Sequence, residues 1–143
     1  MKRITPFILL AGDLVALLLF VYVGQRDHEM VNAENPILGL LPTVGAFALP
    51  WVVAGWWLGV FRDGETLTAR TLLGRTLNAW LVTAFLGLLF RALLLQRAVI
   101  PTLFAIAALG FGGAFLLGWR MLFLLALKIL KSRQIPARSS NTA

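Results

Sequence analysis

The sequence predicts an all-α integral membrane protein built as a bundle of four membrane-spanning helices. Of its 143 residues, 59% are hydrophobic and only 13% are charged, whereas soluble domains carry about 25% charged residues. The mean hydropathy is +0.86, and four long apolar runs occupy most of the chain. These runs leave no room for a separate soluble domain, so composition alone indicates an integral membrane protein.

The first apolar run predicts a span over residues 6–24, which is long enough as a helix to cross the hydrocarbon core. A carboxylate, Asp13, interrupts this run, so the segment differs from the apolar region of a secretory signal. Pro36 opens the second run, which predicts a span over residues 40–61. Pro50 lies inside this span and is expected to kink the helix.

The third apolar run predicts a span over residues 72–95, preceded by a short interfacial helix over residues 66–75. Arg75 and Arg91 lie near the two ends of this run, and each is expected to snorkel toward its own interface. Asn78 is a further polar residue within the predicted span.

The fourth run predicts a span over residues 99–127. Residues 98–119 carry no charge, and Arg120 then lies inside the span. Residues 1–131 are therefore expected to form one transmembrane domain. The remaining residues, 132–143, are polar and basic and predict a disordered cytoplasmic tail.

The distribution of basic residues predicts that both termini lie on the cytoplasmic side of the cell (inner) membrane. In this orientation nine Lys and Arg residues flank the spans on the cytoplasmic side and three on the other, and such an excess marks cytoplasmic flanks. The net charge of +7 is therefore interpreted as a topology signal, and nucleic-acid binding is not expected. Four tryptophans would then form a belt in the cytoplasmic half: Trp56, Trp57, Trp80 and Trp119.

Two ionisable side chains are predicted to lie at the same depth in the membrane. Asp13 follows the start of the first span by about seven residues, and Arg120 precedes Lys128, where the fourth span ends, by a similar number. A charge in hydrocarbon costs from about 2.5 to more than 10 kcal/mol, so it is usually paired. We therefore predict an ion pair that joins the first helix to the fourth, with a proton relay or substrate site as the alternative.

Small residues recur at four-residue spacing on three of the predicted helices. In lipid, such faces let helix backbones approach closely. We predict that these faces pack helices within the bundle, and a dimer interface is the alternative. The positions are Gly12 and Ala16, Gly55 and Gly59, Ala108 and Gly112, and Gly110 and Ala114.

The sequence offers few groups for catalysis or metal binding. It contains no cysteine and one histidine, His28, which lies between Asp27 and Glu29 in a polar cluster of the first outer loop. A histidine-based zinc or haem site needs further ligands, so the cluster is interpreted as solvated surface. A divalent-ion site and an enzyme acting on lipid or quinone remain alternatives for this cluster. No metal site is predicted, no cofactor is assigned, and the chain is expected not to be an enzyme.

Two groups of residues recur together in a known family. The first is Gly12-Asp13 with Ala16, Phe20, Gly24 and His28, and the second is Pro50, Gly55-Trp56, Trp80, Arg91 and Leu117-Gly118-Trp119-Arg120. In this pattern the chain resembles the domain-of-unknown-function 3054 family of small bacterial membrane proteins. The resemblance implies four membrane spans and no particular activity, and it is compatible with a place in energy-converting membranes. Family members often carry Arg-Ser before the histidine, where this chain has Arg26-Asp27.

These observations predict a non-enzymatic accessory or assembly subunit of a larger membrane complex, photosynthetic or respiratory. Its partners would be the lipid bilayer and other membrane protein subunits, because small-residue faces and aromatic residues suit lateral contacts. The alternative is a small oligomeric transporter of protons, ions or solutes. In that case four polar residues would line the route: Asp13, Asn78, Arg91 and Arg120.

Overall fold

The computed structural model describes residues 5–27, 35–62, 68–94, 96 and 102–133. Within these residues the structure is all-α, which confirms the predicted fold class. Among the described residues, four helices are long and apolar enough to cross a membrane.

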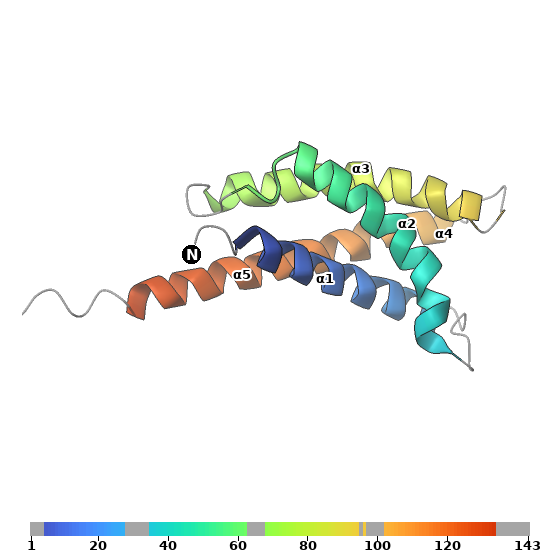
Figure 1. Ribbon diagram of the computed structural model, residues 1–143, viewed down its shortest axis with the longest axis horizontal. Coiled ribbons are helices and arrows are strands. Elements are labelled where there is room, and N and C mark those ends of the chain that lie inside the picture. The colour runs from blue at the N-terminus through green and yellow to red at the C-terminus, as the bar shows by residue number, and fades with distance from the viewer. Residues whose placement is uncertain (1–4, 28–34, 63–67, 95, 97–101, 134–143) are drawn as a thin grey trace, which may run out of the picture.

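The helical segments follow one another along the chain in an up-and-down order. The first three helices are α1 (Thr5–Asp27), α2 (Pro36–Trp57) and α3 (Ala69–Leu94). The fourth helix has three consecutive segments, α4 (Thr102–Ala107), the π-helical η1 (Ala108–Gly112) and α5 (Gly113–Arg133). Its 32 residues extend about 48 Å, which exceeds the roughly 30 Å of a hydrocarbon core. The last turns of α5 accordingly extend past the start of α1 (Figure 1).

The first turn of α1 and the last turn of α5 lie at the same end of the bundle, here called the termini end (Figure 1). The other end, where α3 finishes and α4 begins, is called the opposite end. α2 crosses α1 and α5 at a steep inclination in this view and makes its most extensive contact with α3. α1 packs against both α2 and α5.

The second helix ends earlier than the sequence suggests, at Trp57 instead of residue 61. Gly59 takes a left-handed φ of 69°, a conformation that glycine adopts without strain and that commonly ends helices. The chain then folds back, and a Cβ at Gly55 would lie 2.6 Å from the Phe61 ring. The prediction that Gly55 and Gly59 form one helix face is therefore wrong, because they shape a turn.

The third helix begins directly at Ala69 and runs without a break to Leu94. The Thr68 hydroxyl oxygen accepts a hydrogen bond from the Thr71 amide at 3.3 Å, which satisfies a free N–H of the first turn. A separate interfacial helix over residues 66–75 is thus not observed within the described residues, and residues 63–67 lie outside them.

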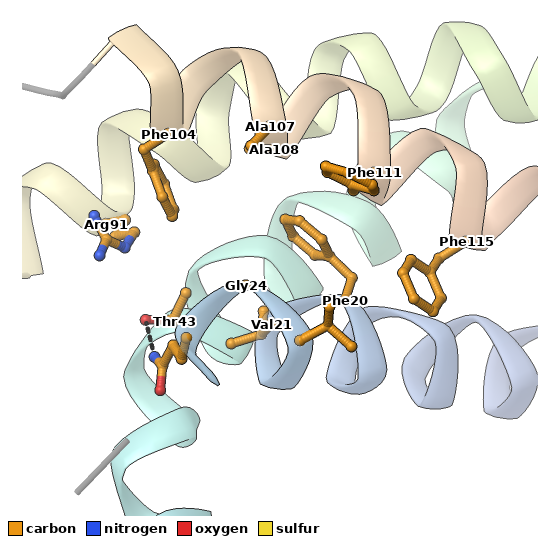
Figure 2. A pocket seen from close by; sticks show the side chains of 12 residues that line it. Phe20, Val21, Gly24, Thr43, Arg91, Phe104, Ala107, Ala108, Phe111 and Phe115 are labelled. Carbon is orange, nitrogen blue, oxygen red and sulfur yellow. Dashed lines mark hydrogen bonds between the residues drawn. The ribbon is translucent and has the colours of Figure 1, made fainter. Parts of the chain in front are cut away.

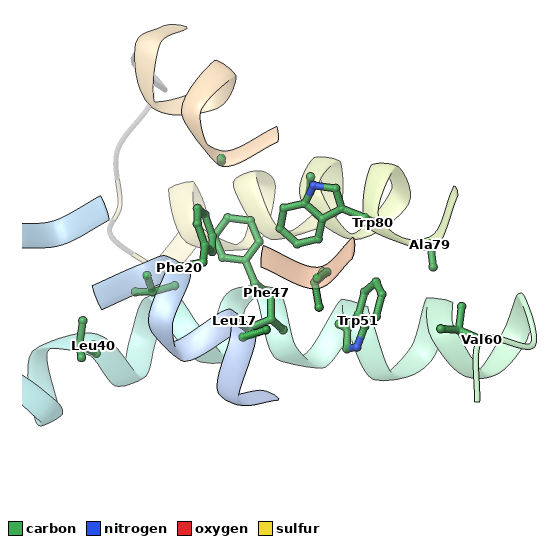
Figure 3. Close-up of a cluster of buried hydrophobic side chains, with 13 residues drawn as sticks. Leu17, Phe20, Leu40, Phe47, Trp51, Val60, Ala79 and Trp80 are labelled. Carbon is green, nitrogen blue, oxygen red and sulfur yellow. The ribbon is translucent and has the colours of Figure 1, made fainter. Parts of the chain in front are cut away.

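Aromatic rings from three helices form the centre of the core (Figure 3). The ring centroids of Phe20, Phe47 and Trp80 lie 5.6 to 6.0 Å apart, within the range of favourable aromatic pairs. Phe47 packs where Gly87 has no side chain. Large side chains on α2 and α3 therefore fill spaces that glycine provides.

The tryptophans do not all form the predicted interfacial belt. Trp80 is 1% exposed and belongs to the core, so its place in that belt was wrongly predicted. Trp56 and Trp57 are 77% and 83% exposed at the end of α2, as residues of a belt would be. Sequence position predicts the depth of a residue, whereas the rotation of its helix decides whether it faces lipid.

Candidate functional site

The structure brings Asp13 of α1 and Arg120 of α5 into contact. The Arg120 Nη2 atom donates to Asp13 Oδ2 at 2.5 Å, and both side chains are 0% exposed. The pair engages one carboxylate oxygen, not the two that a guanidinium fork can reach. It links the first and last helices of the bundle at a point where both are buried.

Two further groups complete the contact, and sequence reasoning missed both. The Trp51 Nε1 atom of α2 donates to the same Asp13 Oδ2 at 3.1 Å. The Arg120 Nη1 atom donates to the carbonyl oxygen of Val60 at 3.3 Å, in the turn after α2. The Phe61 ring covers the guanidinium, with its centroid 5.8 Å from Arg120 Cζ. The ion pair therefore ties together α1, α2, the following turn and α5.

The contacts around Asp13 and Arg120 are of the kind that hold helices together within a membrane. Every polar contact described above joins side chains or backbone of different segments, and the two charges offset one another. Neither Asp13 nor Arg120 lines the groove or the cavity described below. The cluster can thus hold the helices in register while keeping both charges away from lipid.

The other predicted polar residues lie elsewhere. Asn78 is exposed on the outer face of α3. The Arg91 Cζ atom lies 4.0 Å from the centroid of the Phe104 ring, near the opposite end. Asp27 is the last residue of α1, and residues 28 and 29 of the predicted polar cluster lie outside the described residues. Asn78 therefore lies on an exposed face, and Arg91 lines a cavity that includes neither residue of the ion pair.

The small-residue faces of α1 and the fourth helix divide into buried and exposed positions. Gly12 lies against the Trp119 ring, and Gly112 lies against the Trp80 ring. Gly110 and Ala114 are exposed, so the prediction that this pair packs helices within the bundle is wrong. Residues 110 and 112 lie about 200° apart around a helix, so Gly110 faces outward when Gly112 faces the bundle.

A groove of about 450 Å³ runs between α1 and α5 and is lined almost entirely by apolar atoms. Four of its lining residues, two from each helix, are glycine or alanine. Larger side chains, including Leu19 and Leu122, also line it and are exposed. The lining is Gly12, Val15, Ala16, Leu19, Ala114, Phe115, Gly118, Trp119 and Leu122.

A second, partly enclosed cavity of about 110 Å³ lies near the opposite end, between α1, α2, α3 and the fourth helix (Figure 2). Gln25, Thr43 and Arg91 provide its polar groups, and the Gln25 Nε2 atom donates to Thr43 Oγ1 at 3.3 Å. Phenylalanine rings form much of the remaining wall. Sequence reasoning did not find this cavity, because its residues come from four separate helices.

Four apolar helices and an outer surface of large hydrophobic side chains define a multi-pass α-helical membrane protein that contacts the lipid bilayer. Over residues 10–123 the chain matches the family described as "Protein of unknown function (DUF3054)", and it belongs to that family. The matched region includes both residues of the ion pair, and it confirms the resemblance found in the sequence. No similar protein was found among curated proteins or among solved structures.

Proposed function

We propose that the protein is a non-enzymatic accessory or assembly subunit of a larger complex in the bacterial inner membrane, photosynthetic or respiratory, with both termini in the cytoplasm. The observation that carries this proposal is the groove between α1 and α5. In this proposal a transmembrane helix of a partner subunit occupies the groove.

The shape and chemistry of the groove support a helix as its occupant. Glycine and alanine on both walls allow the backbone of a third helix to approach, and close packing drives helix association in lipid. The lining is almost free of polar atoms, so a polar ligand would find few hydrogen-bond partners there. A groove formed by Gly12, Ala16, Ala114 and Gly118 is therefore suited to van der Waals contact with an apolar helix.

The buried ion pair supports the same proposal. Asp13 and Arg120 contact one another and are fully buried, and Arg120 also donates to the Val60 carbonyl oxygen, so the pair helps to hold the bundle together. A rigid bundle with a preformed lateral groove can bind a partner without the cost of ordering itself.

Co-purification from native membranes tests the proposal. The tagged full chain, extracted in mild detergent, is expected to retain a partner subunit identified by mass spectrometry. Ala114→Leu fills the groove from an exposed position and is expected to lower the recovered partner by at least about tenfold, a loss of roughly 1.4 kcal/mol. Ala126→Leu, on an exposed part of α5 outside the groove, is the matched control. A monodisperse chain without partners, or equal recovery with both variants, contradicts the proposal.

The transport alternative receives less support from the positions of its four residues. Asp13 and Arg120 are paired and buried, Asn78 is exposed, and Arg91 lines a separate cavity. Proton or ion flux into proteoliposomes that Asp13→Asn abolishes, while the variant still folds, would favour transport over the accessory role.

A further inference from the structure

We propose that the cavity near the opposite end binds the head of a single-chain amphiphile that carries a carboxylate, the chemistry of a fatty acid. The cavity is bounded by polar side chains at one side and by aromatic rings at the other (Figure 2). This proposal does not rest on the partner groove, which shares only Phe115 with the lining of the cavity.

The polar side of the cavity suits an anionic hydrogen-bond acceptor. Gln25, Thr43 and Arg91 reach it from α1, α2 and α3 respectively, and the first two side chains are buried. A guanidinium has five N–H donors, so Arg91 can keep other contacts and still bind a carboxylate. Such charge-assisted bonds are stronger than neutral ones, which favours a carboxylate over an alcohol.

The apolar side of the cavity suits a hydrocarbon chain. Phe104, Phe111 and Phe115 line it from the fourth helix, and Phe20 and Val21 line it from α1 (Figure 2). Phe111 is 63% exposed, so the cavity opens to the side of the bundle there. A tail can leave through this opening into lipid while the head stays between the helices.

The size of the cavity decides how much of the amphiphile it holds. Its volume is about 110 Å³, and a cavity of about 150 Å³ in another protein holds one benzene molecule. The space therefore fits a carboxylate with its first methylene groups. The head of a diacyl phospholipid, with a phosphate and two ester groups, is too large for it.

The glycine at residue 24 offers a direct way to fill the cavity. Gly24 lines it, and a Cβ there would meet no atom within 4 Å. Gly24→Leu therefore adds a side chain at the wall of the cavity, and its Cβ has room. Gly74→Leu is the matched control, because Gly74 is exposed, has the same free surroundings and lies outside the cavity.

Oleate binding to the full chain in neutral maltoside detergent, measured by native mass spectrometry, tests the proposal. Oleate is expected to bind at least about tenfold more tightly than oleyl alcohol, because the alcohol lacks the charge that Arg91 recognises. Gly24→Leu and Arg91→Gln are each expected to weaken oleate binding by at least about tenfold, whereas Gly74→Leu and Arg70→Gln change it less than about twofold.

Three results would overturn the proposal. These are equal binding of oleate and oleyl alcohol, unchanged oleate binding in Gly24→Leu, and displacement of oleate by an equal concentration of dioleoylphosphatidylglycerol, which would identify a phospholipid phosphate as the ligand. Circular dichroism establishes that each variant is folded. Should Gly24→Leu fail to fold, Arg91→Gln and the comparison of the three amphiphiles decide the question.

Discussion

Asp13 Oδ2 accepts hydrogen bonds from two side chains on different helices, Arg120 and Trp51. The guanidinium offsets the charge of the carboxylate, which in hydrocarbon would otherwise cost from about 2.5 to more than 10 kcal/mol. The indole N–H of Trp51 is itself buried and needs an acceptor. The Asp13 carboxylate therefore provides a hydrogen-bond acceptor for Arg120 and Trp51, and these two side chains provide donors for Asp13.

Replacing Trp51 with phenylalanine tests the contribution of the indole to this cluster. The ring and its packing against Phe61 largely remain, but Asp13 Oδ2 loses a donor. We expect the free energy of unfolding to fall by about 1–3 kcal/mol, the usual cost of losing a partner of a buried polar group. Unfolding in mixed detergent micelles, followed by circular dichroism, measures this change.

Trp57→Phe is the control for that measurement, because Trp57 is exposed and close in sequence. Its unfolding free energy is expected to stay within about 0.5 kcal/mol of the native value. Equal effects of the two substitutions would show that the indole N–H of Trp51 contributes nothing specific.

At the scale of elements, the contact between α3 and the fourth helix depends on the π-helical segment η1. The Trp80 Nε1 atom donates to the carbonyl oxygen of Leu109 at 2.9 Å, and the indole lies against Gly112 and Gly113. The π-helical turn and the missing side chains together admit a large ring between two helix backbones. The contact fixes the rotation of the fourth helix relative to α3.

Gly112→Ala is expected to destabilise the protein, because the new methyl group would collide with the fixed Trp80 ring. Overpacking costs about 1–3 kcal/mol, more than the gain of up to about 1 kcal/mol from better helix propensity. Gly110→Ala, two residues away in the same segment, meets no atom within 4 Å and is expected to be neutral or stabilising. Unfolding midpoints of both variants in the same detergent measure the difference, and a more stable Gly112→Ala would contradict this account.

At the scale of the whole molecule, the sequence predicted those features that depend only on where a residue lies along the chain. The four spans and the equal depth of Asp13 and Arg120 follow from the lengths of apolar runs, which can be counted. Trp51, the Val60 carbonyl and the outward position of Gly110 depend on the rotation of each helix. In a membrane protein both the buried and the lipid-facing sides are apolar, so periodicity does not indicate which side is inside.

There is a second reason why the sequence did not predict the placement of the aromatic residues or the presence of the cavities. The π-helical turn at residues 108–112 changes the register of the fourth helix, and α2 ends at a left-handed glycine inside its predicted span. Both irregularities move later residues to other faces. The groove and the cavity are formed by residues from separate helices and appear only when the helices are packed.

The orientation of the bundle can be tested on the whole molecule, because the native chain contains no cysteine. A cysteine introduced at Gln96, at the opposite end, is expected to react with an impermeant maleimide in intact cells. A cysteine at Ser132, near the end of α5, is expected to react only after the membrane is permeabilised. The reverse pattern would contradict the cytoplasmic location of both termini, which rests on the distribution of basic residues.

The central claim is that the buried pair of Asp13 and Arg120 holds α1 to α5, and a double-mutant cycle of unfolding free energies tests it most directly. Asp13→Leu and Arg120→Met are each expected to cost about 3–5 kcal/mol, because each leaves a buried charge without its partner. The double replacement removes both charges and is expected to be less destabilised than either single variant. Single costs that add to within about 0.5 kcal/mol in the double variant would contradict the claim.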